Sequence, residues 1–168
     1  MSAARPPACT VAVVIERERA PNAWEDWRFT IADVLPDDGR WGDPDVPGGA
    51  APRVLRDDGR TAQLLHPGLP VRLHADEAEG YYLNLSSGAP VWFVMWRIDD
   101  EDPSRAWPAL VTLSYNEAGR LLDAQERVDN RPLDPAMRGL LQAFVDAHYR
   151  PEPKQRRRPA SFRRPEER

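Results

Sequence analysis

Few residues in this 168-residue chain have the types and spacing that support catalysis. The histidines are His66, His74 and His148, and the one cysteine is Cys9. The sequence holds no glycine-rich phosphate loop, no paired-histidine zincin motif and no nucleophile elbow. A single cysteine excludes an internal disulfide and a cysteine-based zinc or iron–sulfur site within one chain. We therefore predict no catalytic residue, no metal and no cofactor.

One short segment brings polar and titratable side chains close together in the sequence. His74 and Glu77 are three residues apart, and Tyr81 and Asn84 follow them. A histidine near a carboxylate is typical of acid–base and metal sites, but the same pair also occurs where a strand end meets a solvated turn. We take His74, Glu77 and Asn84 as candidate ligand-site residues. A minor activity involving His74, Glu77 and Tyr81 stays open.

Aromatic residues form a second group of interest. Trp24 and Trp27 stand at the break between the first two apolar segments, and Tyr81 and Tyr82 are adjacent in the middle of the chain. Such side chains usually build a core and its rim, and the alternative is an exposed groove for a peptide or another subunit. These four residues are candidate interaction residues.

Charge is distributed unevenly along the chain. Residues 151–168 contain seven basic and three acidic side chains, whereas the preceding 150 residues contain sixteen basic and twenty-four acidic ones. The segment also has four prolines and one large apolar residue, Phe162, so we expect a disordered arginine-rich tail. Its Arg156, Arg157 and Arg158 are candidate contacts to an acidic protein surface. The acidic domain argues against a nucleic-acid partner, so we rank that function third.

Alternation of apolar and polar residues predicts a series of short strands. The first, residues 10–19, should have a wetter face formed by Ala12, Val14 and Glu16. The apolar run 91–98 (VWFVMWRI) is expected to be a central strand covered on both faces. A hairpin is predicted near 54 and 64, on either side of the turn Asp57-Asp58-Gly59-Arg60. Further strands are predicted at 27–35, 71–74, 81–85 and 108–113, and near 128.

Helix signals are fewer, and they favour the C-terminal half. We expect one helical turn at 76–80, capped by Asp76 and ended by Gly80, and a short helix at 115–124 that begins with a capping box at Ser114. Asp134-Pro135 opens a final helix, with Asp134 as its N-cap. Its apolar stripe consists of Met137, Leu140, Leu141, Phe144, Val145 and His148. The predicted fold is α+β: six to eight short, mainly antiparallel strands, as a sheet or partly closed barrel, packed by this C-terminal amphipathic helix.

The predicted domain organisation is simple. We expect a flexible N-terminus at 1–9, one α+β domain at 10–150 with a Pro/Gly-rich loop at 36–52, and the tail at 151–168. No apolar run reaches 18 residues, so no membrane insertion is expected. The first ten residues lack the apolar run of a signal peptide, which favours a cytoplasmic location.

Four stretches in order carry a resemblance to a known family. They are residues 11–17 (VAVVIER) followed by Trp24-x-x-Trp27, residues 73–85 (LHADEAEGYYLNL), residues 111–118 (VTLSYNEA), and residues 144–148 (FVDAH) before a basic end. Over residues 10–158 the chain resembles a family of small bacterial proteins of unknown function, and it departs from that family mainly in the loop 36–52. Members are often encoded beside formate dehydrogenase subunits and maturation factors. The family has no established catalytic residues.

The resemblance implies an accessory role for a formate dehydrogenase, and the charge pattern is compatible with it. Our first interpretation is a non-enzymatic interaction protein that supports assembly, maturation or regulation, with a formate dehydrogenase subunit or maturation factor as partner. The alternative is a small-molecule or cofactor-binding domain. The third is an arginine-tailed nucleic-acid binder.

Overall fold

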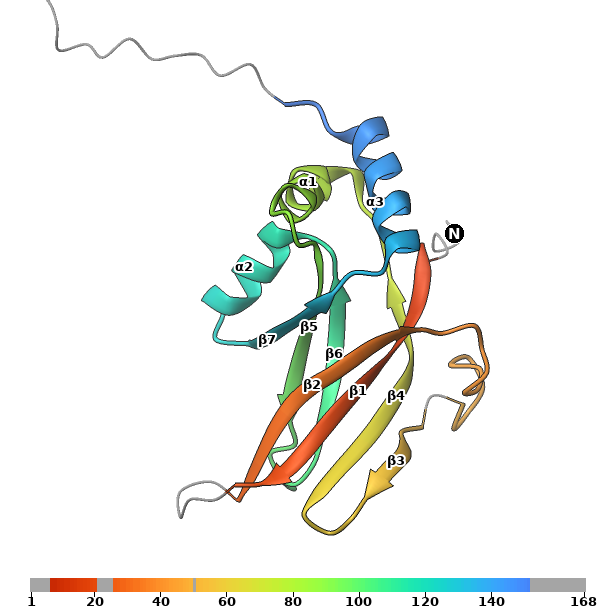
Figure 1. Cartoon of the computed structure of the whole chain (residues 1–168), viewed down its shortest axis with the longest axis vertical. Helices are drawn as coiled ribbons and strands as arrows, with labels where there is room; N and C mark the ends of the chain where they lie inside the picture. The colour runs from red at the N-terminus through yellow and green to blue at the C-terminus, as the bar shows by residue number, and fades with distance from the viewer. Residues whose placement is uncertain (1–6, 21–25, 50, 152–168) are drawn as a thin grey trace, which may run out of the picture.

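Two antiparallel sheets and a group of helices make up the part of the chain that the computed structural model describes, residues 7–20, 26–49 and 51–151 (Figure 1). The first sheet has the order β2 (Trp27–Pro36), β1 (Cys9–Arg19), β4 (Thr61–Val71) and β3 (Arg53–Asp57). The second has the order β6 (Ala106–Thr112), β5 (Val91–Ile98) and β7 (Arg127–Pro132). Neither sheet closes, so the prediction of an α+β fold with mainly antiparallel strands is confirmed in its open-sheet form.

The main core lies between the two sheets. Val11, Val13 and Ile15 of β1 are buried in one cluster with β5 side chains, among them Trp92 and Val94. Alternate residues of both strands point the same way, so each strand contributes every second side chain to this cluster. As predicted, β5 is the central strand of its sheet.

The outer face of β1 differs from its prediction. Ala12 and Val14 were expected on a wetter face, but they are buried in a second cluster with Leu65 of β4. Half-buried side chains packed against this cluster include Trp41, which comes from the Pro/Gly-rich loop. The loop therefore covers the back of the first sheet, and a strand pattern alone cannot show such a cover.

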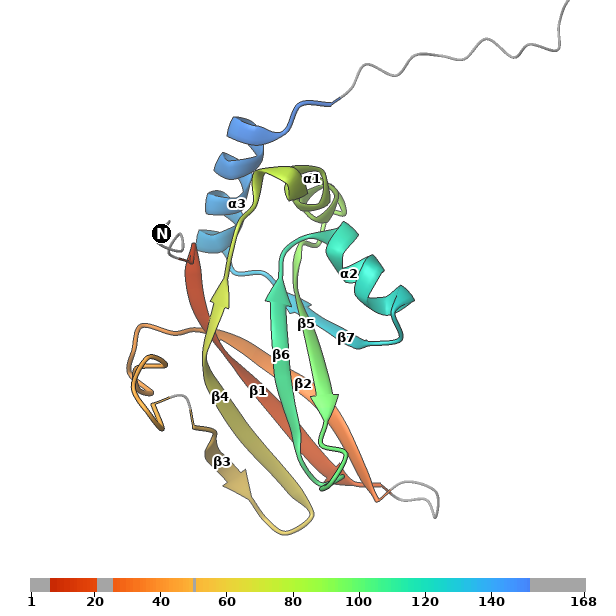
Figure 2. The same cartoon turned by 180° about the vertical axis from the view of Figure 1, so that it is seen from behind.

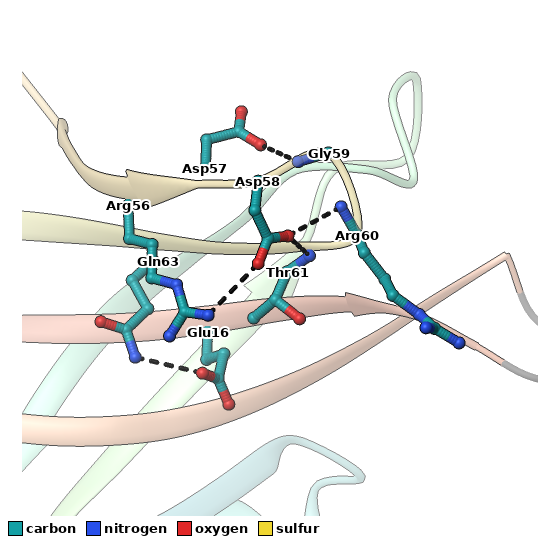
Figure 3. Close-up of polar contacts among 8 residues, drawn as sticks. All are labelled: Glu16, Arg56, Asp57, Asp58, Gly59, Arg60, Thr61 and Gln63. Atoms are coloured by element: carbon teal, nitrogen blue, oxygen red, sulfur yellow. Dashed lines mark hydrogen bonds and ion pairs between the residues drawn. The ribbon is translucent and has the colours of Figure 1, made fainter.

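The turn between β3 and β4 is held by aspartate side chains, as Figure 3 shows. Asp57 accepts from the backbone N–H of Gly59, and Asp58 accepts from those of Arg60 and Thr61. Gly59 has a φ of +83°, a conformation that glycine adopts at no steric cost. The hairpin predicted from Asp57-Asp58-Gly59-Arg60 is thus confirmed.

The segment after β4 was predicted wrongly. Residues 71–74 do not form a separate strand, because β4 runs without a break to Val71. The 3₁₀-helix η1 (Ala75–Glu77) follows and leads into the helix α1 (Ala78–Ser86), which replaces the strand predicted at 81–85 (Figure 2). No Asp76 side-chain cap is present, and Gly80 lies inside α1 instead of ending it.

The other two helices follow their sequence signals. In α2 (Tyr115–Asp123), the Ser114 side chain caps the N-terminus by accepting from the Glu117 N–H. In α3 (Pro135–His148), the Asp134 side chain accepts from the Met137 N–H, and Pro135 occupies the first turn. The buried side of α3 consists of Met137, Leu141 and Val145. Leu140 and His148, also on the predicted apolar stripe, are exposed.

Candidate functional site

A stacked pair of tyrosines marks the end of the molecule where the helices lie. Tyr82 of α1 and Tyr149, directly after α3, have ring centroids 4.6 Å apart and nearly parallel planes. Tyr82 keeps 42% of its surface exposed. A hollow of about 420 Å³ borders Tyr149 and is also lined by Glu79 and Arg150. We call Tyr82 and Tyr149 the tyrosine pair. It is an apolar surface with polar hydroxyls, which is the kind of surface enriched at protein interfaces.

The arginine-rich segment follows this pair in the sequence. The described chain ends at Pro151, two residues beyond Tyr149. Arg156, Arg157 and Arg158 lie outside the described residues, as does Trp24. The tail predicted to be disordered and most of the N-terminus predicted to be flexible also fall there. Of the N-terminal residues that are described, Ala8 donates its N–H to the Val71 carbonyl, and β1 already begins at Cys9.

Trp27 and Tyr81, two of the candidate interaction residues, make contacts within the protein. The guanidinium groups of Arg17 and Arg19 lie over the Trp27 ring, 4.6 Å and 4.9 Å from its centroid. Tyr81 is only 1% exposed, and its hydroxyl accepts from the His74 backbone N–H. Burial raises the pKa of Tyr81 to about 12. Of the candidate aromatic residues that the structure describes, Tyr82 is the most accessible.

The ligand-site candidates separate in space. His74 lines a cavity of about 600 Å³ beside α3, together with Asp76, Leu140 and Phe144. Glu77 instead faces α2, where it accepts hydrogen bonds from the Ser114 hydroxyl at 2.5 Å and from Arg120. The carboxylate thus ties η1 to the start of α2, and the structure does not bring it to the cavity that His74 lines.

Asn84 is a buried connector. Its side-chain amide nitrogen donates to the carbonyls of Val91 and Leu113, and its amide oxygen accepts from the Val91 N–H. The residue is 2% exposed. Both amide hydrogens are therefore used within the protein, where they join α1 to the beginning of β5 and the end of β6.

A second cavity, which the sequence did not predict, lies between the two sheets. It has a volume of about 160 Å³. The register places Arg17 beside Phe29 and Ile15 beside Leu64, all on the face of the first sheet that is turned to the second. The loop between β5 and β6 contributes Ser104 and Arg105 on the other side. We call this space the inter-sheet cavity.

His66 of β4 also lines the inter-sheet cavity, and it is 9% exposed. Its Nε2 atom is buried and has no hydrogen-bond partner among the described residues. Burial, and secondarily the charge of Arg105, lower the pKa of His66 to about 4. The imidazole is therefore neutral near pH 7, and a buried polar atom of this kind normally has a partner.

The whole domain was compared with protein families, curated proteins and solved structures. A model for proteins of unknown function, DUF3305, matches residues 10–158. The chain belongs to the DUF3305 family. No curated protein and no solved structure gave a match.

The DUF3305 match covers α1, α2 and α3, the inter-sheet cavity, and both sheets except for Cys9 at the start of β1. Within residues 7–20, 26–49 and 51–151, no group of three or more His, Cys, Asp or Glu side chains is placed to hold a metal ion. Over the same part of the chain, no helix has the length and apolar character needed to cross a membrane. Cys9 is half-buried, and burial together with Asp134 raises its pKa to about 11, so its thiol is protonated at neutral pH.

Proposed function

We propose that this DUF3305 protein is a cytoplasmic, non-enzymatic accessory protein that binds a formate dehydrogenase subunit or maturation factor. The observation that carries the proposal is the tyrosine pair, in which Tyr82 is exposed and Tyr149 is followed in the sequence by a segment with seven basic and three acidic side chains. The family's usual gene neighbours, implied by the sequence resemblance, supply the identity of the partner.

The basic segment and the tyrosine pair are expected to act at different steps of binding. Basic side chains accelerate the encounter with an acidic surface, and this effect decreases with salt. Aromatic side chains that become buried in the complex mainly slow its dissociation. We therefore expect Arg156, Arg157 and Arg158 to govern the association rate, and Tyr82 to govern the dissociation rate.

Surface plasmon resonance against the purified dehydrogenase and its maturation factors tests this division. Tyr82→Ala should increase the dissociation rate about fivefold or more, as expected for an interface residue contributing about 1 kcal/mol or more. The matched control is Leu55→Ala, an exposed apolar residue on β3 at the far end of the molecule (Figure 1). It should leave both rates unchanged.

The tail offers its own control. Replacing Arg156, Arg157 and Arg158 with glutamine should slow association and reduce its salt dependence. The same changes at Arg163, Arg164 and Arg168 remove equal charge farther along the sequence from Tyr149 and should have a smaller effect. The proposal is wrong if the intact protein binds none of these proteins at low salt. The small-molecule alternative, which the inter-sheet cavity favours, would then come first.

A further inference from the structure

We propose that the inter-sheet cavity binds a small monocarboxylate that carries a short hydrocarbon group. This site is separate from the tyrosine pair, and the inference does not depend on the accessory role.

The inter-sheet cavity is lined by positively charged side chains, although the domain as a whole is acidic. Arg17 and Arg105 both line it, although residues 1–150 carry eight more acidic than basic side chains. Asp102 is a neighbouring carboxylate. Hydrogen bonds with Ser104 chiefly lower its pKa, and the charges of Arg105 and Arg17 lower it further. Within the part of the chain that the structure describes, the cavity lining itself contains two guanidinium groups and no carboxylate, which suits an anion.

Two residues that line the cavity each carry a buried nitrogen without a hydrogen-bond partner among the described residues. They are Nε2 of His66 and Nε of Arg17. The Arg17 side chain is nevertheless held in place, because its Nη1 donates to the Ser104 carbonyl at 2.9 Å and its guanidinium lies over Trp27. A neutral imidazole can present an N–H at Nε2. A carboxylate with two acceptor oxygens would satisfy these donors, and unsatisfied buried donors are costly.

The size and the walls of the cavity restrict the anion. Its volume of about 160 Å³ equals that of about five liquid water molecules and is below the roughly 300–1,000 Å³ typical of pockets for larger ligands. Most of the lining is apolar, from Ile15, Phe29, Pro52, Leu64, Ala106 and Trp107. Inorganic phosphate would leave these walls uncovered, whereas a short hydrocarbon group would bury them.

Binding to the full-length protein can be followed by NMR of the histidine imidazoles, at constant ionic strength, with acetate, butyrate, benzoate or inorganic phosphate. Butyrate should give saturable shifts at His66 and bind about fifteenfold more tightly than acetate, because it has two more methylenes and each buried methylene contributes about fourfold. His74 and His148, which are exposed, should not shift. Absence of saturable butyrate binding, or tighter binding of phosphate than of butyrate, would overturn the proposal.

A conservative change at the cavity mouth tests the role of charge. Arg105 is exposed, so Arg105→Gln should leave the fold intact and weaken butyrate binding about tenfold or more. Arg138→Gln, on the exposed side of α3, is the control and should have no effect. Equal affinity for butyrate in Arg105→Gln and the unmodified protein would refute the site.

The imidazole provides a second readout that a purely structural histidine would not give. A bound carboxylate brings negative charge beside His66, so the His66 pKa should rise above its value of about 4. Arg105 acts electrostatically on His66, Arg17 of β1 lines the same cavity, and Asp102 lies near these two arginines. The His66 titration should cover about pH 3 to 7 with and without butyrate, and the butyrate concentration should be set so that its ionised form stays in excess at each pH. An unchanged His66 pKa at saturating butyrate would place the ligand elsewhere.

Discussion

Replacing Gly80 with alanine should destabilise the protein, although the same change usually stabilises a helix. Gly80 lies inside α1, where it faces the start of α2. An added Cβ would collide with the Ser114 Oγ atom and would lie 3.1 Å from the Ser114 Cβ. The Ser114 hydroxyl cannot move freely, because it accepts from the Glu117 N–H and donates to Glu77.

The expected size follows from two opposing effects. Alanine in place of glycine favours a helix by about 1 kcal/mol. Overpacking costs about 1–3 kcal/mol, and disturbing the Ser114 cap costs about 0.5–2 kcal/mol more. Gly80→Ala should therefore lower the free energy of unfolding by about 0.5–4 kcal/mol.

Urea unfolding, followed by circular dichroism, gives this value directly. Gly139→Ala on α3 is the matched control, because nothing lies within 4 Å of its added Cβ, and it should stabilise by about 0.5–1 kcal/mol. Adding Ser114→Gly to Gly80→Ala removes the side chain with which the new Cβ collides. The double variant should therefore recover at least about 1 kcal/mol of the free energy of unfolding that Gly80→Ala alone loses. The reasoning is refuted if Gly80→Ala stabilises the protein as much as Gly139→Ala does.

Three further predictions concern buried side chains. Leu141→Ala should cost about 2–5 kcal/mol in urea unfolding, whereas Leu140→Ala, one residue away and 42% exposed, should cost under about 1 kcal/mol; equal costs would contradict the assigned face of α3. Asn84→Ala should cost about 2–5 kcal/mol, since three hydrogen bonds are lost and the carbonyls of Val91 and Leu113 each lose a donor. Because the pKa of His66 is about 4 when folded against 6.5 otherwise, stability should fall from pH 6.5 to 4, and His66→Gln should show a smaller fall.

The elements that the sequence predicted well are those with a local cause. The hairpin at Asp57-Asp58-Gly59-Arg60 and the caps at Ser114 and Asp134 depend on side chains that bond the backbone two or three residues away. The strand predicted at 81–85 was wrong. It was predicted because Tyr81, Leu83 and Leu85 alternate with other residues, which is the pattern of a strand. The buried residues of α1 are Ala78, Gly80, Tyr81, Asn84 and Leu85, and the spacing of 78, 81 and 85 is helical.

The sites were harder to predict, because they depend on contacts between distant segments. His74 and Glu77 are neighbours in the sequence, but η1 turns Glu77 to Ser114 and Arg120 on the far side. The sequence indicated no role for His66. In the structure it lines a cavity together with residues 104–107, which lie nearly forty positions later in the chain. A signal was present: Leu64 and His66 share a strand face, so a histidine replaces an expected apolar residue.

The two proposed surfaces are distinct, and this makes their tests independent. The tyrosine pair joins α1 and the end of α3, while the inter-sheet cavity lies among β1, β2, β4 and the start of β6. Substitutions at distant sites without shared partners act additively within about 0.3–0.5 kcal/mol. Tyr82→Ala should therefore leave butyrate binding unchanged, and Arg105→Gln should leave the dissociation rate from the protein partner unchanged. If either variant alters both measurements, the sites are coupled through the packing between the sheets and the helices, and neither surface can be assigned its role from single substitutions alone.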